Sequence, residues 1–208
     1  MRASTRCRTE KVVLIGGQST GKTSIVQRFN NGGFNPNNPS TVGAAFFSAQ
    51  FSIDNKQIKL EIWDTAGSEK YKSLTPMYYR DARAAIIVFD VTSPVSLEQA
   101  SEWIAELRKN GRSDCIFIGA ANKIDLVTKR CISTEGVKEF AFSNMLADVR
   151  ETSALTGTGV RELFECVSAQ LLKLDPLIDE TEPELITLVN TGGSSERQEN
   201  GIFGSCDC

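Results

Sequence analysis

The sequence predicts an α/β fold with an open, six-stranded, mostly parallel sheet, one antiparallel strand, and helices on both faces. Two observations predict this fold. Apolar runs of strand length alternate along the chain with amphipathic stretches of helix length, and two of the runs, 84–90 and 115–122, are apolar almost throughout, as in parallel strands covered on both faces. With 208 residues, 40% of them hydrophobic, the chain is long enough to bury one core. We therefore expect a single domain followed by a tail.

The first part of the chain supplies three strands and one helix. Residues 11–16 form a buried strand, and residues 22–30, after a Gly-rich turn, carry apolar side chains at helical spacing. Residues 46–54 and 57–63 alternate apolar and polar side chains around a turn at 54–55, which predicts an antiparallel hairpin. One face of this hairpin is apolar and consists of Ile58, Leu60 and Ile62.

The rest of the domain consists of strands followed by helices. Ser93 as an N-cap and Pro94 in the first turn indicate where one helix begins, and Gly111 indicates where it ends. The remaining expected elements are strands at 84–90, 115–122 and 148–152 and helices at 134–144 and 160–174. Ligands bind at the carboxyl ends of the strands in such a sheet, so functional residues are expected in the loops that follow them.

Composition argues against several classes of function. The chain contains no His, so Ser-His and Cys-His nucleophilic catalysis are excluded, and its six cysteines form no CxxC pair for a zinc site. No basic patch with interleaved aromatic residues is present, so no nucleic-acid partner is expected. No apolar stretch approaches the roughly 18 residues of a membrane span, and no apolar segment follows the basic N-terminus, so we expect a cytosolic chain.

Charge is divided unevenly along the chain. Residues 175–208 hold eight acidic residues and one arginine, a net charge of −7, whereas residues 1–174 hold 22 basic and 18 acidic residues, a net charge of +4. Hydrophobic periodicity also fades after residue 174. The expected organisation is an N-terminal extension at 1–10, the folded domain at 11–174, and a flexible acidic tail at 175–208.

Residues 16–23, GGQSTGKT, fit the pattern G-x-x-x-x-G-K-[ST] and lie between a predicted strand and a predicted helix. Backbone N–H groups of such a loop point inward, and the helix N-terminus favours an anion. The Lys22 ammonium can reach the outer phosphates of a nucleotide, and the Thr23 hydroxyl can ligate Mg²⁺. The alternative is a Gly-rich turn without a ligand. The residues of this loop and the start of the following helix that are expected to bind the nucleotide are Gln18, Ser19, Thr20, Gly21, Lys22, Thr23 and Ser24.

Residues 64–67, DTAG, follow another strand. Asp64 is placed to hold the same Mg²⁺ through water, and the Gly67 N–H to meet a γ-phosphate. Alone, this sequence is also a good turn.

Residues 122–125, NKID, end the next strand, and residues 151–155, ETSAL, follow the last one. Asp125 can accept hydrogen bonds from the ring N–H and the amino group of guanine, whereas adenine presents the opposite pattern. The N–H groups of Ser153 and Ala154 are placed to reach the guanine carbonyl. Each motif alone suits a structural loop, but their order, each after a predicted strand, favours a guanine nucleotide. Asn122 and Lys123 belong to the same predicted site.

Together these motifs resemble the small GTPases of the Ras superfamily and, within it, the Rab family, over about residues 11–174 and the last three residues. The Rab resemblance rests on VGAAF, KLEIWDTAGSE, KYKSLT, YYRDA and IVFDVT. VGAAFF and SLTPMYYRDARAAI look most like the early-endosomal Rab subgroup. The resemblance implies a P-loop NTPase G domain that binds GTP or GDP with Mg²⁺ and hydrolyses GTP.

By position, Thr41 resembles the switch threonine that closes on Mg²⁺ and the γ-phosphate, and Phe34 resembles the aromatic residue that packs against guanine. The implied Mg²⁺ residues are Thr23, Thr41 and Asp64. The residues implied in hydrolysis are Lys22, Thr41, Gly67 and Ser68.

Three residues depart from the family pattern. Ser68 stands where the family usually has the Gln that orients the attacking water, so we expect slow intrinsic hydrolysis. Gln18 stands where Ras proteins have Gly, and its side chain would crowd an arginine finger. Leu155 replaces the Lys that often follows Ser-Ala, which makes the packing over the base less polar.

The C-terminal CDC, with Cys206 and Cys208, resembles the Rab Cys-X-Cys signal for two geranylgeranyl groups. The alternative is two exposed cysteines on a tail. A single lipid binds membranes only marginally and a tail of charge −7 is repelled by an anionic leaflet, so both lipids are needed. The resemblance implies the cytoplasmic face of intracellular membranes, with early endosomes as the candidate organelle, and a cytosolic pool.

Three hypotheses follow. The first is a GTP/GDP switch of vesicle traffic, which implies effectors, an exchange factor, a GTPase-activating protein, a prenylation escort and a GDP-dissociation inhibitor as partners. The second is a membrane-tethered GTP-binding module that hydrolyses almost nothing and serves as an effector scaffold. The third, an ATP-using P-loop enzyme, is disfavoured by Asp125 and by the lack of a domain for an acceptor substrate.

Overall fold

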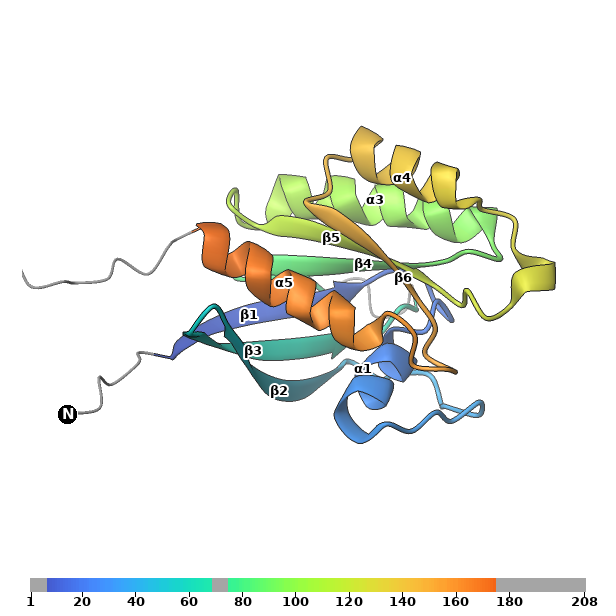
Figure 1. The fold of residues 1–208 in the computed structure, drawn as a ribbon. Helices are drawn as coiled ribbons and strands as arrows, with labels where there is room; N and C mark the ends of the chain where they lie inside the picture. Colours follow the sequence, from blue (N-terminus) through green and yellow to red (C-terminus); the bar gives the residue numbers. More distant parts are fainter. Residues whose placement is uncertain (1–6, 69–74, 175–208) are drawn as a thin grey trace, which may run out of the picture. The chain divides into compact units, whose positions relative to one another are not determined.

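Six strands form one sheet in the order β2-β3-β1-β4-β5-β6 in a computed structural model, which describes residues 7–68 and 75–174 (Figure 1). Of these strands only β2, paired with β3, runs antiparallel to its neighbour. The strands are β1 (Arg8–Ile15), β2 (Ala44–Ile53), β3 (Lys56–Thr65), β4 (Ala84–Asp90), β5 (Ile116–Asn122) and β6 (Asp148–Thr152). The predicted α/β fold with a single antiparallel strand is confirmed.

Helices cover both faces of the sheet (Figure 1). They are α1 (Lys22–Asn31), α2 (Thr75–Tyr79), α3 (Pro94–Asn110), α4 (Thr134–Ser143) and α5 (Val160–Leu174), with a short 3₁₀ helix η2 (Val127–Lys129). Helices α1 and α5 pack with the hairpin face predicted from Ile58, Leu60 and Ile62 in one core. Helices α2, α3 and α4 pack against the opposite face in a second core. None of the helices in the described part of the chain is long and apolar enough to cross a bilayer.

The largest boundary difference concerns β1, which begins at Arg8, three residues before the predicted start. Arg8 and Glu10 form an ion pair, and Arg83 lies 3.8 Å from the same Glu10 carboxylate. These ionic contacts allow a polar segment to pair with β3, where apolar periodicity gave no signal. Helix α2 and η2, of five and three residues, were not predicted, because each is too short to show a helical repeat.

Ser93 occupies the predicted N-cap of α3, but its side chain makes no capping hydrogen bond. The hydroxyl of Ser96, one turn further, donates to the carbonyl oxygens of Ser93 and Asp90 at 2.8 and 3.0 Å. The start of α3 is thereby fixed to the end of β4.

The sheet register brings the functional loops together. Asp90 at the end of β4 pairs with Asn122 at the end of β5, and Asn122 pairs with Thr152 at the end of β6. The loops that follow these strands therefore start at the same edge of the sheet.

Candidate functional site

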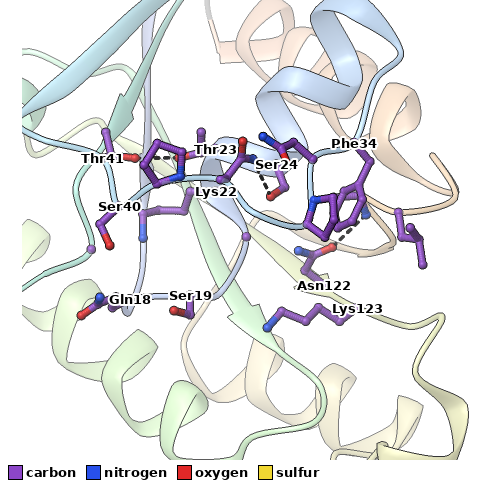
Figure 2. Close-up of a pocket in the computed structure, with 18 of the residues that line it drawn as sticks. Gln18, Ser19, Lys22, Thr23, Ser24, Phe34, Ser40, Thr41, Asn122 and Lys123 are labelled. Atoms are coloured by element: carbon purple, nitrogen blue, oxygen red, sulfur yellow. Dashed lines mark hydrogen bonds between the residues drawn. The ribbon is translucent and has the colours of Figure 1, made fainter.

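A pocket of about 460 Å³ lies at this edge (Figure 2). The structure brings 15 of the predicted residues to its lining: Gln18, Ser19, Gly21, Lys22, Thr23, Ser24, Phe34, Thr41, Gly67, Ser68, Asn122, Lys123, Asp125, Ala154 and Leu155. Three other predicted residues, Thr20, Asp64 and Ser153, are buried and do not line the pocket. Motifs up to 137 positions apart in the sequence thus surround one cavity.

The loop between β1 and α1 forms one end of the pocket. Gly21 has a φ of 97°, and a Cβ there would lie 2.3 Å from Asn122 Nδ2, so only glycine fits. The Lys22 ammonium is buried and donates to the carbonyl oxygens of Gly16 and Gly17, each at 2.8 Å. Burial lowers the pKa of Lys22 from 10.5 to about 8, although the nearby Asp64 carboxylate acts in the opposite direction. A buried cation held by neutral carbonyls is suited to an anionic ligand.

A cluster next to this ammonium has the chemistry of a Mg²⁺ site. The hydroxyl oxygens of Thr23 and Thr41 lie 2.8 Å apart. Both carboxylate oxygens of Asp64 are buried, and neither makes a hydrogen bond of full geometry in the described residues, although the Thr23 hydroxyl and the Lys22 ammonium are near enough to act on its pKa. Burial raises the pKa of Asp64, while the Thr23 hydroxyl and the Lys22 charge lower it. Hard oxygen donors, including a buried carboxylate without a full hydrogen bond, fit a Mg²⁺ ion with its water ligands.

Gly67 brings the loop after β3 close to the phosphate-binding loop. A Cβ at this position would lie 2.5 Å from the Lys22 ammonium and 2.7 Å from the Gly17 carbonyl oxygen. Any side chain would therefore push the two loops apart. Ser68, the next residue, lines the pocket at the same end.

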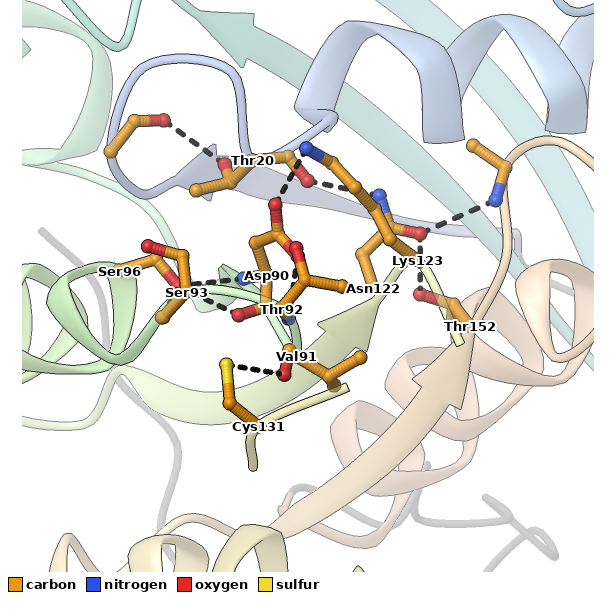
Figure 3. A network of polar contacts seen from close by, with 12 residues as sticks. Thr20, Asp90, Val91, Thr92, Ser93, Ser96, Asn122, Lys123, Cys131 and Thr152 are labelled. Carbon is orange, nitrogen blue, oxygen red and sulfur yellow. Dashed lines mark hydrogen bonds and ion pairs between the residues drawn. The ribbon is translucent and has the colours of Figure 1, made fainter. Parts of the chain in front are cut away.

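Asn122 joins three loops at the other end of the pocket, as Figure 3 shows. Its Nδ2 donates to Thr20 O at 2.9 Å. Its Oδ1 accepts from Thr152 Oγ1 at 3.2 Å and from the Ala154 N–H at 3.3 Å. Because Asn122 is 1% exposed, its main contribution is to fix the loops that line the pocket.

Asp125 is oriented by the loop after β6. The Ser153 hydroxyl donates to Asp125 Oδ1 at 2.5 Å and accepts from the Thr156 N–H at 3.1 Å. The Ser153 N–H, predicted to face the base, donates to Thr158 O at 2.9 Å. In this structure Ser153 therefore acts on the site through its hydroxyl.

Sequence reasoning missed seven lining residues: Asn35, Pro36, Asn38, Pro39, Ser40, Thr65 and Leu126. Most belong to the segment between α1 and β2, whose only signal was its place between Phe34 and Thr41. Asn38 fastens this segment to α1, because its Nδ2 donates to Gln27 Oε1 at 2.7 Å and lies 3.4 Å from Ser24 Oγ.

Arg28 was also missed. Its guanidinium donates to Ala154 O at 2.7 Å and also to the carbonyl oxygens of Leu155 and Gly32. One side chain on α1 thus joins the loop at the base end to the beginning of the segment that carries Phe34. Sequence spacing could not indicate a contact between residues 126 positions apart.

Some predictions lie outside the described residues. These are the acidic tail at 175–208, with Cys206 and Cys208, and the part of the Rab-like motifs that falls in residues 69–74.

Fold and site together define an α/β nucleotide-binding protein with a phosphate-binding loop. The model of the Ras family matches residues 11–173. Ras-related protein Rab5 from Nicotiana tabacum is 46% identical over 166 residues, which cover 80% of this chain and 82% of the relative. RABF2b from Arabidopsis thaliana is 45% identical with the same coverage. Rab5A from Oryza sativa subsp. japonica is 44% identical over 81% of this chain and 82% of the relative.

The chain belongs to the Ras family of small GTPases and, within it, to the Rab5-like group. The predicted resemblance to the early-endosomal Rab subgroup is thereby confirmed. Members of this family bind GTP and GDP with Mg²⁺ and hydrolyse GTP, in agreement with the donor groups around the pocket.

Proposed function

We propose that the protein is a GTP/GDP switch of endocytic vesicle traffic that hydrolyses GTP slowly without a partner. The observation that carries this proposal is the buried Asp64 carboxylate, which makes no hydrogen bond of full geometry in the described residues and has only the nearby Thr23 hydroxyl and Lys22 charge to act on it. A buried charge left this way is unfavourable for the protein alone. It is explained if the site holds a metal ion together with phosphates.

Different residues of the pocket bind different parts of the nucleotide. The 16–23 loop and Lys22 hold the phosphates, while Asp125 and its Ser153 partner select guanine. Thr23, Thr41 and Asp64 would hold Mg²⁺, which when bound offsets the negative charge of the phosphates. Thr41 and Gly67 lie on the two segments that sense the outer phosphate, so loss of that phosphate releases both segments.

Ser68 is the reason to expect slow hydrolysis. A Gln at this place accepts a hydrogen bond from the attacking water and donates toward the developing charge. The Ser68 hydroxyl stands on a single carbon and is too short to bridge the water and the γ-phosphate. A partner protein that supplies an amide and an arginine would restore the reaction.

The second candidate is a membrane-tethered GTP-binding module with negligible hydrolysis that serves as an effector scaffold. Ser68 also supports this candidate, because the pocket keeps its binding groups while the water-orienting side chain is absent. The two candidates differ in whether a Rab-type activating protein stimulates turnover.

Membrane attachment is proposed through geranylgeranyl groups on Cys206 and Cys208. The proposed location is the cytoplasmic face of intracellular membranes, in particular early endosomes, with a cytosolic pool. The proposed partners are those of a Rab cycle: effectors, an exchange factor, an activating protein, a prenylation escort and a GDP-dissociation inhibitor. Resemblance to Rab5 proteins supports these proposals.

Competition binding tests the nucleotide assignment. Fluorescent GDP bound to the full-length chain with Mg²⁺ is displaced by GTP, GDP or ATP, and Lys22→Ala serves as the control that loses the phosphate contact. We expect GTP and GDP to displace the probe at far lower concentrations than ATP does. Equal displacement by ATP would remove the guanine assignment, and unchanged affinity in Lys22→Ala would remove the phosphate-loop assignment.

A further inference from the structure

One charged side chain at the base end of the pocket is held by a residue that does not line the pocket. Lys123 lines it, and its Nζ lies 2.6 Å from Oδ2 of Asp90, at the end of β4. Figure 3 shows this ion pair next to Asn122, and Figure 2 shows the Lys123 side chain extended in the direction of Ser19. The proposed function gives Asp90 no role.

Asp90 is itself fixed by the surrounding structure. The N–H and the hydroxyl of Thr92 donate to Asp90 Oδ1 at 2.8 and 2.7 Å. The Asp90 N–H donates to Ser96 Oγ at 2.9 Å, and Asp90 O accepts from the same hydroxyl at 3.0 Å. Oδ1 thus accepts hydrogen bonds from Thr92, and Oδ2 pairs with the Lys123 ammonium. These contacts fix the carboxylate at the end of β4.

Two properties of Lys123 indicate that an ion pair with Asp90 would favour nucleotide binding. Its φ of 69° lies in the left-handed region, which is uncommon for lysine. A lysine side chain also loses about 1.5–2 kcal/mol of conformational entropy when it is immobilised. If Asp90 immobilises the side chain before the ligand arrives, that loss no longer weakens binding.

The place of Lys123 indicates which part of the ligand it serves. It lies between Asn122 and Asp125, the residues at the base end, whereas the phosphate end already has the buried ammonium of Lys22. Guanine carries no net charge, so the methylene chain of Lys123, and not its ammonium, is the part suited to contact the base. The ammonium needs a counter-charge, which Asp90 supplies.

We propose that Asp90 is a positioning residue for nucleotide retention, which holds Lys123 so that its methylene chain forms a preset wall of the base end. This proposal rests on the proposed function as a guanine-nucleotide switch. Burial disfavours the charged form of Asp90, but the contacts with Lys123 and Thr92 outweigh it and hold its pKa below the ordinary value. Asp90 therefore remains an anion at neutral pH.

The ion pair would weaken nucleotide binding, instead of strengthening it, if the Lys123 ammonium contacted the phosphates. Asp90 would then compete with the ligand for the ammonium, and removal of its charge would slow nucleotide release. The direction of the change in release rate therefore separates positioning from competition.

The test measures release of fluorescent GDP from the full-length chain with Mg²⁺. The variants are Asp90→Asn, Lys123→Met and the double variant. Asp114→Asn is the control, because it removes the same charge from ion pairs with Arg83 and with Arg112, the latter 2.8 Å long, in the loop before β5. Loss of one charge-assisted contact predicts about tenfold faster release in Asp90→Asn. Release from the double variant should equal that from Lys123→Met alone, and Asp114→Asn should behave as wild type.

Several results would overturn the proposal. Unchanged or slower release in Asp90→Asn contradicts positioning, and a full additional effect of Asp90→Asn in the Lys123→Met background would show that Asp90 acts on the fold. If Asp90→Asn does not fold, Thr92→Val removes one hydrogen bond to Asp90. It should speed release by a smaller factor, and no effect would refute the proposal. A wild-type chain that does not bind GDP would instead overturn the proposed function itself.

Discussion

Replacement of Asp64 by Asn should stabilise the nucleotide-free protein and weaken its response to Mg²⁺. The Asp64 side chain is fully buried, and neither oxygen makes a hydrogen bond of full geometry in the described residues. A buried polar group without a partner costs about 1–3 kcal/mol, and a charged group costs more. An amide leaves part of that penalty in place and removes the counter-charge of the buried Lys22 ammonium, so we expect a net gain of at most about 1 kcal/mol. In a domain of this size, each kcal/mol raises Tm by roughly 2–4 °C.

The gain should depend on pH in a defined direction. Burial raises the pKa of Asp64 above its ordinary 3.8, so the folded state disfavours the charged carboxylate. Below about pH 4 the Asp64 carboxyl group is protonated, and its burial does not lower the free energy of unfolding of wild type through a buried charge. As pH rises through the folded-state pKa, wild type loses stability relative to Asp64→Asn. The difference should grow as pH rises above about 4 and should stay constant once pH exceeds the folded-state pKa of Asp64.

The assay is thermal unfolding of both proteins without nucleotide in EDTA, and again with GDP and Mg²⁺. Wild type should gain much more from Mg²⁺ and GDP than Asp64→Asn does, because loss of a residue that orients metal ligands weakens affinity by about 10–100-fold. A lower Tm for Asp64→Asn in EDTA, or an equal gain from Mg²⁺ in the two proteins, would refute this account of the metal site.

Three further predictions concern the base, the loops and the tail. Asp125→Asn should shift preference from GTP toward XTP, because an amide presents a donor where guanine presents its own; an unchanged ratio of the two affinities would exclude this role for Asp125. Arg28→Lys should speed GDP release by about three- to tenfold, because an ammonium cannot reach all three carbonyls that the guanidinium joins; release at the wild-type rate would show that this tie does not hold the base loop. Cys206→Ser combined with Cys208→Ser should give a folded, nucleotide-binding protein that no longer fractionates with membranes; persistence on membranes in cells would contradict double prenylation.

Sequence patterns predicted several elements with the bounds that the structure has. The strand at 84–90, the strand at 148–152 and the helix at 160–174 have the predicted bounds. The start of β1 was wrong because Arg8 and Glu10 pair through space with each other and with Arg83, a contact that no local pattern encodes.

The candidate site was predicted as a set of motifs, because each motif has its own spacing after a strand. The sequence could not predict how the motifs support one another. The hydroxyl of Ser153 orients Asp125, Asn122 joins loops 102 positions apart, and Arg28 reaches the base loop from α1. The first two contacts depend on the order of the strands in the sheet, and the Arg28 contact depends on the packing of α1.

Single-turnover GTP hydrolysis tests the central claim most directly. Wild type and Ser68→Gln are each loaded with GTP and Mg²⁺ and followed with and without a Rab-type activating protein. We predict that Ser68→Gln raises the intrinsic rate about tenfold, which corresponds to ~1.4 kcal/mol of transition-state stabilisation. The activating protein should strongly stimulate wild type. An unchanged intrinsic rate in Ser68→Gln, with GTP still bound, would contradict the role given to Ser68, and no stimulation of wild type by any activating protein would favour the binding module over the switch.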